Sequence, residues 1–549
     1  MTEEQTTLAQ AAQAPEGVPP VLDEAHIGDI RGALGTIRVH DTGERHGLRS
    51  RGMALLAIMG PGLIVMVGDN DAGGVSTYAQ AGQNYGTSLL WVLLLLIPVL
   101  VVNQEMVIRL GAVTGVGHAR LIFERFGRFW GAFSVGDLFI LNFLTIVTEF
   151  IGVSLALGYF GLSKYVAVPV AAAALIAITS TGSFRSWERF MYVFVVANFL
   201  VIPLLLLAHP NVGQIAHSTF LPSVHGGANS TAVLLIIAIV GTTVAPWQLF
   251  FQQSNIIDKR ITPRWINYER LDTVIGAFVV VIGAGALISV TAFAFGGTSY
   301  FAHFSDAGTV ATQLGHRLGS VAGTFFAVVL LNASLIGAAA VTLATSYAFG
   351  DVFGAKHSLD RGPLDAKLFY ASFSLMVVAA AGIVLIPNAP LGLITTSVQA
   401  LAGVLLPSAT VFLLLLCNDR EVLGPWSNPP WLNAIASVII GVLVELSLIL
   451  MASTMFPGVN VVGLFVYLSI GLVVTLSVAA LYALRNRAPA GMEVEKISRE
   501  RRSTWTMPPL ALLERPVWSP GRKGAMLLLR GYLVVAVLLL VVKSVQLGH

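Results

Sequence analysis

The chain has 549 residues, of which 55% are hydrophobic and 11% are charged, and its formal net charge is +3. Soluble domains are about half apolar and about a quarter charged. This composition, with a mean hydropathy of +0.79, excludes an ordinary soluble protein and indicates an all-α polytopic membrane protein. The single cysteine, Cys417, excludes a disulfide framework and a cysteine metal cluster.

The N-terminal residues 1–53 are expected to form a disordered cytosolic tail. Residues 1–30 are polar and acidic and contain no apolar core, so we expect no cleaved signal peptide. The first membrane span then serves as its own insertion signal.

Thirteen later segments are apolar enough to cross a bilayer, which takes roughly 20 residues. The last is the weakest, because Arg530 lies inside it, so the expected total is about 12–13. The predicted spans are 54–78, 86–108, 132–160, 165–181, 190–208, 231–257, 273–296, 321–349, 368–387, 391–416, 432–455, 459–484 and 524–546.

The lysines and arginines test this map independently of hydropathy. With the N-terminus in the cytosol, all of them except Lys164, Arg317 and Lys543 fall on the cytosolic side, as the positive-inside rule requires. We therefore expect a multi-pass protein of the plasma (bacterial inner) membrane with a cytoplasmic N-terminus.

The predicted organisation has five parts. They are the tail 1–53, a transport core of ten spans over 54–417, two further spans over 418–487, a basic cytosolic linker over 488–523 and an additional C-terminal span over 524–549. The linker is interpreted either as lying against the anionic leaflet or as an ordinary cytosolic connection.

Two of the predicted spans are interrupted at membrane depth. The first contains "VGDNDAGGVSTY" (67–78), with Asp69, Asp71 and a pair of glycines, and the sixth contains Gly241-Thr242-Thr243 followed by Ala245-Pro246. Irregular backbone at this depth is tolerated only where it is buried in protein or lines a cavity. Interrupted helices in corresponding positions predict a transport site between inverted repeats of spans 1–5 and 6–10.

Asp71 lies inside the first interruption and is the first predicted metal ligand. A charged group at the bilayer centre costs about 2.5–3.5 kcal/mol on insertion scales, and a cation beside it offsets that cost. The alternative is a structural acid satisfied by freed backbone amides. Asp69 faces either the pathway or an internal partner, and the sequence leaves both open.

The first interrupted span resembles that of a known family. "GPGLIVMVGDNDAGGVSTYAQAG" is similar to the first-helix signature of the NRAMP divalent-metal transporters. The family's Asp-Pro-Gly-Asn break falls on Asp71, Ala72, Gly73 and Gly74.

Two further segments carry the same resemblance, which runs from about residue 54 to about 455. In "IVGTTVAPWQ" the family's Met-Pro-His falls on Ala245, Pro246 and Trp247, and in "SVQALAGVLLP" a family glutamine falls on Gln399. "CNDREVLG" is similar to the segment that follows. The resemblance implies a LeuT-type fold with inverted repeats and broken helices 1 and 6, plus extra C-terminal spans.

The departures from the family pattern are systematic. Ala245 replaces the thioether ligand and Gly74 replaces the amide ligand. In the third span Glu149 matches one family acid, but Phe139 and Ile146 occupy two other positions tied to the family's proton route. This combination resembles the branch called NRAMP-related magnesium transporters.

The chemistry of the remaining groups favours the same branch. Sulfur selects softer metals, whereas oxygen ligands suit Mg²⁺, which keeps several waters and is held by one or two carboxylates. The predicted metal-site residues are Asp71, the carbonyls of Gly68 and Thr242, Gln399, Glu149, and the pocket-shaping Gly74 and Ala245. The predicted pathway residues are Asp69, Trp247, Pro246 and Gly73.

The leading hypothesis is therefore a Mg²⁺ and Mn²⁺ uptake transporter that alternates access around Asp71. Without the third-span acids it is expected to be uncoupled from protons and driven by the ion gradient and the membrane potential. That potential supplies about 2.3 kcal/mol per charge per 100 mV. We expect no resident cofactor, no enzymatic activity, no nucleic acid and no obligatory protein partner, only the metal cargo and the bilayer.

Three alternatives remain. One is a proton-coupled Mn²⁺/Fe²⁺ transporter of the ordinary NRAMP type, which Ala245 argues against. Another is an intramembrane aspartyl protease with Asp69 and Asp71 as its dyad, although such enzymes place their acids on two helices. The third is an organic-substrate transporter of the same fold, which Asp71 disfavours.

Other polar residues receive structural or open interpretations. Glu105 and Arg109 are four residues apart and predict a helical ion pair. Asp137 is interpreted as a helix-entry or vestibule acid, and Glu445 has no assignment. The remaining predictions are cytosolic-loop charges for Glu188 and Arg189, and solvated loop residues for His209, His217 and His225.

Overall fold

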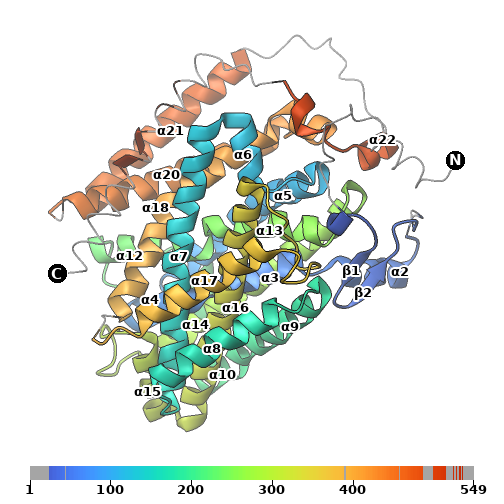
Figure 1. Cartoon of the computed structure of the whole chain (residues 1–549). Helices are drawn as coiled ribbons and strands as arrows, with labels where there is room; N and C mark the ends of the chain where they lie inside the picture. The colour runs from blue at the N-terminus through green and yellow to red at the C-terminus, as the bar shows by residue number, and fades with distance from the viewer. Residues whose placement is uncertain are drawn as a thin grey trace.

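The computed structural model describes residues 24–41, 43, 45–388, 391–456, 458–485 and 499–514, together with single positions between 524 and 535. Most of this part is helical (Figure 1). The first 23 residues of the predicted tail lie outside it, as does most of the predicted thirteenth span.

The expectation of a disordered tail is wrong from residue 24 onward. A 3-10 turn, η1 (Glu24–His26), precedes an antiparallel hairpin of β1 (Ile30–Gly32) and β2 (Gly35–Ile37), in which Ile30 pairs with Ile37. The hairpin packs on α2 (Leu48–Ile58). A Cβ at Gly32 would lie 2.0 Å from the carbonyl oxygen of Ala57, so this close packing requires glycine.

The first predicted span is divided into three helices rather than two. After α2 come α3 (Pro61–Gly68) and α4 (Ala72–Tyr85), and α2 and α3 are bent by 55°. Gly60 adopts a φ of 149°, which favours glycine, and Pro61 begins α3. The bend therefore lies at the "GPG" sequence, one helix before the interruption at Asp69–Asp71.

The rest of the first repeat follows the predicted order. Spans two to five are α5 (Leu90–Thr114), α7 (Arg128–Tyr159), α8 (Lys164–Thr179) and α9 (Phe184–Ala197), the last continued by η2 (Asn198–Leu200) and α10 (Val201–Leu207). The connecting helices are α6 (His118–Phe126) and α11 (Val212–Phe220).

The second repeat begins with the other interrupted span. Its helices are α12 (Ser230–Thr243) and α13 (Pro246–Asp258), then η3 (Pro263–Trp265), α14 (Ile266–Phe295), α15 (Ala307–Leu318), α16 (Ser320–Phe353), α17 (Lys367–Val384) and α18 (Leu391–Cys417). The C-terminal part contains α19 (Arg420–Leu423), η4 (Gly424–Trp426), α20 (Pro430–Met455), α21 (Val461–Arg485), α22 (Arg499–Thr504) and η5 (Leu510–Leu512).

Part of the predicted basic linker packs on the protein itself. The backbone N–H of Met507 donates to the carbonyl of Val113 at 3.0 Å, and Arg125 donates to the carbonyl of Glu514 at 2.6 Å. Residues 499–514 thus bind the ends of α5 and α6. Neither earlier interpretation of the linker included this contact.

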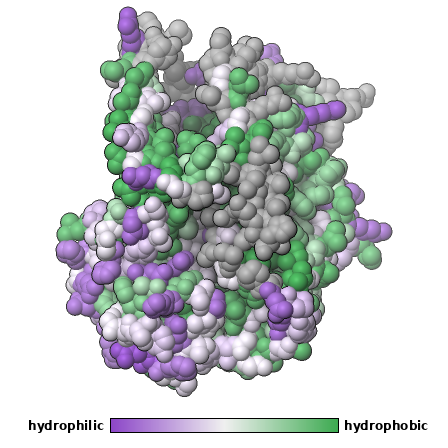
Figure 2. Space-filling view, turned by 90° about the vertical axis from the view of Figure 1, so that its left-hand side faces the viewer, coloured by the Kyte–Doolittle hydropathy of each residue, from purple (hydrophilic) through white to green (hydrophobic). Residues whose placement is uncertain are grey.

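Ten helices in the described part are long and apolar enough to cross a membrane, or eleven if the bent pair of α2 and α3 counts as one span. The shorter α8 is also apolar and coincides with the predicted fourth span. Each of the first twelve predicted spans therefore contains a helix. Figure 2 shows one face of the surface, where hydrophobic side chains form broad areas and hydrophilic ones are most numerous in the lower part, with others at the top and the right-hand edge.

Corresponding helices of the two repeats make equivalent contacts, as expected for inverted repeats. The second span, α5, packs against α13 of the sixth, while the seventh span, α14, packs against α3 and α4 of the first. The third and eighth spans, α7 and α16, pack against each other along the core (Figure 1). This is a LeuT-like fold, in which both interrupted helices lie in the middle of the bundle.

Candidate functional site

The first break places a carboxylate at the start of a helix. α3 ends at Gly68, and Asp71 is the N-cap of α4, where its Oδ1 accepts a hydrogen bond from the backbone N–H of Gly74 at 2.7 Å. A carboxylate is favourable there because the first N–H groups of a helix have no helical partner. Asp71 is 3% exposed, so the break is buried.

The second break exposes the opposite end of a helix. α12 ends at Thr243, Val244 and Ala245 are extended, and Pro246 begins α13. The last carbonyls of α12, including that of Thr242, therefore lack the usual helical partners. The buried Thr242 hydroxyl also has no hydrogen-bond partner among the described residues, so this break offers unused oxygens.

A second carboxylate comes from α7 and lies against the first. Oε2 of Glu149 accepts from the backbone N–H of Ala72 at 3.1 Å, while its Oε1 is buried without a partner in the described part of the chain. Gly337 of α16 packs against both acids. A Cβ at this position would lie 2.6 Å from Glu149 Oε2 and 2.9 Å from the Cβ of Asp71, so a larger residue would clash with them. The close packing of α4, α7 and α16 thus brings two acids together.

Asp69 is the third acid at the first break. It is 0% exposed, and neither of its carboxylate oxygens has a hydrogen-bond partner within the described ranges. The polar side chains that act on it are Asp71 and Gln248 of α13. The side-chain carbonyl oxygen of Gln248 accepts from Gln104 of α5 at 3.3 Å, so Gln248 links the surroundings of Asp69 to the second span.

Gln399 reaches the site from α18. A Cβ at Gly73 would lie only 1.6 Å from Nε2 of Gln399, so the amide lies directly on the first turn of α4. Nε2 has no hydrogen-bond partner among the residues described, and the residue is 3% exposed. The side chain of Gln399, a predicted ligand, therefore packs against Gly73, a predicted pathway residue.

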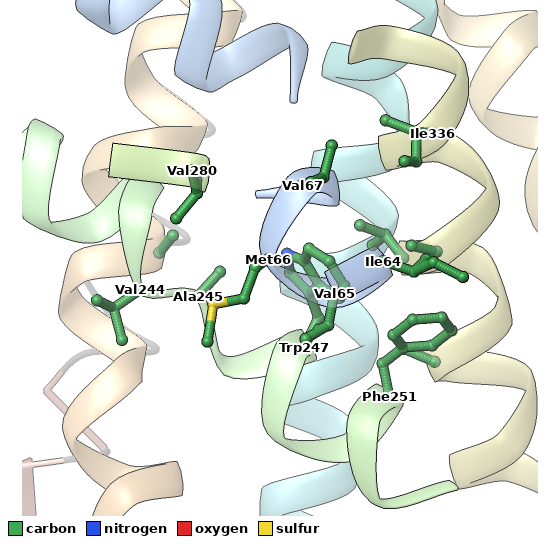
Figure 3. Close-up of a cluster of buried hydrophobic side chains, with 14 of the residues drawn as sticks. Ile64, Val65, Met66, Val67, Val244, Ala245, Trp247, Phe251, Val280 and Ile336 are labelled. Carbon is green, nitrogen blue, oxygen red and sulfur yellow. The ribbon is translucent and has the colours of Figure 1, made fainter. Parts of the chain in front are cut away.

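The second break contributes no sulfur donor to the described site. Trp247 packs on α3, where a Cβ at Gly68 would lie 3.4 Å from the indole, and Ala245 offers only a methyl group (Figure 3). Met66 lies in the same buried cluster, but its side chain packs against Gly276 of α14. The buried atoms at the break without a described hydrogen-bond partner include both carboxylate oxygens of Asp69, Oε1 of Glu149 and the indole Nε1 of Trp247.

The described residues contain no group of three or more histidine, cysteine, aspartate or glutamate side chains arranged to hold a metal ion. Asp69, Asp71 and Glu149 lie at the same break, but their carboxylates are not arranged around a common metal position. Such a site can hold a hard cation only with help from carbonyls, amides and water, which is how Mg²⁺ is usually held.

Several polar groups that were not predicted from the sequence lie beside the break. Gln248 and Gln104 were not predicted, nor was Tyr78, whose hydroxyl hydrogen-bonds the Thr243 hydroxyl at 2.7 Å. The available signal was the presence of two glutamines inside otherwise apolar spans, where an unpaired amide is costly.

Other predictions about polar residues had mixed outcomes. The Glu105–Arg109 ion pair is confirmed, with a contact of 2.9 Å. The assignment of Glu188 as a loop charge is wrong, because its side chain is fully buried and pairs with Lys259 at 2.6 Å. Glu445 accepts from Ser469 of α21 at 2.5 Å and so joins the two C-terminal spans.

Comparison with known proteins identifies the family. The family model described as natural resistance-associated macrophage protein-like (NRAMP) matches residues 62–453, which include both breaks. The chain belongs to the NRAMP family. Ala245 and Gly74 therefore lie within the part of the chain that matches the family, and they differ from the family pattern although both helix breaks are retained.

Curated relatives and solved structures extend this result. The chain is 26% identical over 416 residues to the divalent metal cation transporter MntH of Bacillus subtilis, covering 73% of this chain and 93% of the relative. It is 29% identical over 401 residues to MntH of Ralstonia nicotianae, covering 70% and 87%. These NRAMP relatives are named as transporters and not as enzymes.

The fold agrees with a solved NRAMP structure. The manganese transporter of Eremococcus coleocola, in complex with an aromatic bis-isothiourea substituted compound, matches with a TM-score of 0.61 and 20% identity, covering 81% of this chain and 97% of that one. A histidine-to-alanine mutant of the same transporter matches with a TM-score of 0.62 and 18% identity, covering 82% and 98%. Nearly the whole of that transporter is thus represented here.

Proposed function

We propose that the chain carries divalent metal ions across the membrane through the break at Asp71, that it accepts Mg²⁺ as well as Mn²⁺, and that it moves them without protons. Family membership supports metal transport, because the relatives are named divalent metal cation transporters and the structural neighbour a manganese transporter. We place it in the inner membrane with a cytoplasmic N-terminus, on the distribution of lysine and arginine.

The observation that carries the magnesium part is the donor set around Asp71. Ala245 and Gly74 stand where the family has a thioether and an amide, and buried oxygens of Asp69, Glu149 and Thr242 at the break have no described hydrogen-bond partner. Mg²⁺ prefers oxygen and gives up its water reluctantly. Two small residues leave space for retained water, which supports transport of a hydrated ion.

The proposal that transport is not coupled to protons rests on the side chains of α7. Ile146 is fully buried and apolar, and the ring of Phe139 lies 5.9 Å from that of Phe349. Between Asp137 and Glu149 the sequence of α7 contains no titratable side chain, so this helix offers no continuous relay from the break.

The second candidate is a proton-coupled Mn²⁺/Fe²⁺ transporter of the ordinary NRAMP type. The names of the relatives quoted above favour it, since they mention manganese or divalent metals and not magnesium. Asp69 and Glu149 also supply carboxyl oxygens beside Asp71 that could hold protons. An aspartyl protease is not favoured, because Asp69 and Asp71 belong to one break and the relatives are transporters.

The deciding experiment uses the purified full chain in proteoliposomes. Uptake of Mn²⁺ is measured with Mg²⁺, Ca²⁺ and Zn²⁺ as competitors, and a trapped pH-sensitive dye reports proton movement. We expect Mg²⁺ to compete with Mn²⁺ and the lumen not to acidify. Acidification in step with Mn²⁺ uptake, without competition by Mg²⁺, would establish the second candidate instead.

A further inference from the structure

A second acid on α7 lies on the expected cytosolic side of the break. Asp137 precedes Glu149 by 12 residues, which is about 18 Å along a helix. The two acids belong to one stripe of buried residues that includes Leu141, Thr145 and Thr148. Asp137 is 8% exposed, so it is not an ordinary helix-entry charge at the surface.

Asp137 lines a small cavity directly beyond the second break. The cavity has a volume of about 10 Å³ and is lined by residues of three helices. α7 contributes Ser134, α13 contributes Pro246 and Phe250, and α18 contributes Ser408. Since Pro246 begins α13, the cavity adjoins the half-helix that starts at the metal site.

The hydrogen bonds of Asp137 are incomplete. Its Oδ2 accepts from the Ser408 hydroxyl at 3.3 Å, and its buried Oδ1 has no partner in the described structure. The described residues place no lysine, arginine or histidine within ion-pair distance of it. An ionisable residue buried in a transporter without a protein cation marks an ion pathway more often than a structural contact.

Glu445 shows the other outcome for an isolated acid in this chain. It is 6% exposed and lies in α20, outside the two repeats, where Ser469 donates a hydrogen bond of 2.5 Å to it. Within the described ranges neither acid has a cation partner, but of the two only Asp137 adjoins the break, where it lines a cavity and its buried Oδ1 has no described partner. The two acids therefore form a matched pair for experiment.

We propose that Asp137, with the hydroxyls of Ser134 and Ser408, forms a second binding station for the divalent cargo between Asp71 and the cytosolic end. The inference rests on the proposed function. Carboxylate and hydroxyl oxygens suit hard divalent ions. The cavity has a volume of about 10 Å³, room for about one water molecule, so a hydrated ion reaches this station only as the cavity widens.

Transport kinetics from the two sides test the station. In oriented proteoliposomes, Asp137→Asn should raise the KM for Mn²⁺ on the cytosolic side about tenfold, as expected for losing one ligand, and leave the outer KM within about twofold. Asp137→Glu should restore most of the inner affinity. Glu445→Gln should change neither constant.

A binding measurement separates this inference from the proposed function. In the Asp71→Ala background, Mn²⁺ titration of the purified full chain followed by electron paramagnetic resonance should detect a residual site that Asp137→Asn removes and Glu445→Gln retains. An unchanged inner KM in Asp137→Asn, or a residual site that survives it, would overturn the station. A wild-type chain that moves no metal would overturn the proposed function, while the titration would still decide whether Asp137 binds Mn²⁺.

Discussion

Two groups of buried carboxylates in this chain differ in whether a protein cation is paired with them. At the break, the described hydrogen bonds to Asp71 and Glu149 come from backbone N–H groups, and Asp69 lies near the amide of Gln248. Three of their oxygens, both of Asp69 and Oε1 of Glu149, have no partner among the described residues. At the expected cytosolic end, the Lys259 cluster (Lys259, Glu188 and Asp272) is equally buried but supplies its own cation.

The contacts of the Lys259 cluster show what a structural carboxylate requires. Nζ of Lys259 donates to Glu188 Oε1 at 2.6 Å and to the carbonyls of Ile58 and Met59 at 2.7 Å each. Oδ2 of Asp272 accepts three backbone N–H groups at the "GPG" bend, between 2.8 and 3.2 Å. The chain thus provides a cation for Glu188 and three donors for one oxygen of Asp272, although Oδ1 of Asp272 has no described partner. At the break, where the cation is the proposed cargo, no ion pair is described for Asp69, Asp71 or Glu149.

Removing the Asp71 carboxylate is expected to have the largest effect on transport. Asp71→Ala should abolish Mn²⁺ uptake, because a contact between an ion and a carboxylate worth about 3 kcal/mol corresponds to a loss of roughly 100-fold in affinity. Folding should be largely retained, with a cost of about 1 kcal/mol for the lost helix cap. Uptake in proteoliposomes and the thermal midpoint of the purified protein measure the two effects.

Asp71→Asn is the matched control for the cap, since its side chain can still accept from Gly74. It should also fail to transport while unfolding at the wild-type temperature. Uptake at near wild-type rate in either variant would show that Asp71 is not the ligand.

Breaking the Lys259 cluster should instead reduce stability. Lys259→Met leaves Glu188 buried without its cation, and breaking a buried pair from one side costs about 3–5 kcal/mol. The thermal midpoint of the purified protein should fall strongly. Adding Glu188→Gln to Lys259→Met should recover much of the lost stability. An unchanged midpoint in Lys259→Met alone would show that the Lys259–Glu188 pair does not stabilise the fold.

The selectivity of the break is expected to respond to two substitutions together. Gly74→Asn with Ala245→Met should shift competition for Mn²⁺ uptake by about tenfold from Mg²⁺ toward Cd²⁺, because it adds a soft donor and fills space. A Cβ at Gly74 would lie 3.0 Å from the carbonyl oxygen of Asp69, so overpacking costs of about 1–3 kcal/mol accompany the change. An active double variant that Mg²⁺ still inhibits as strongly would mean that these positions do not set selectivity.

The smallest predicted effect concerns a titratable cation outside the spans. Burial lowers the pKa of His357, but its hydrogen bond to Asp351 and the charge of that residue raise it, to about 9. Because the folded pKa lies above the usual 6.5, the pair stabilises the fold fully below about pH 6.5 and loses this contribution as the pH rises through 9. His357→Gln should lower stability by about 1 kcal/mol at pH 6 and by little at pH 10.

Thermal midpoints at the two pH values measure this effect. His303→Gln, on an exposed loop residue, is the control and should change stability equally at both. A difference between wild type and His357→Gln that does not shrink with rising pH would exclude the protonated pair.

The sequence by itself determined the order of the first twelve spans and the positions of both interruptions. A bilayer leaves the backbone no partner except its own helix, so hydropathy, Pro246 and the Asp71 region are local signals that tertiary packing does not override. The N-terminal hairpin was missed because its short strands carry little local signal and form against α2. Glu188 was misassigned for a similar reason, since its partner Lys259 lies 71 residues away.

Only the tertiary structure decided which polar groups are paired and which are left open. Asp69 and Asp71 look alike in the sequence, but Gly74 donates to one, while the other accepts from no described donor. Gln104, Gln248 and Gln399 meet the break from three different helices. The physical reason is that a carboxylate or amide is satisfied by contacts of defined distance and angle, and a chain order cannot specify these before the helices pack.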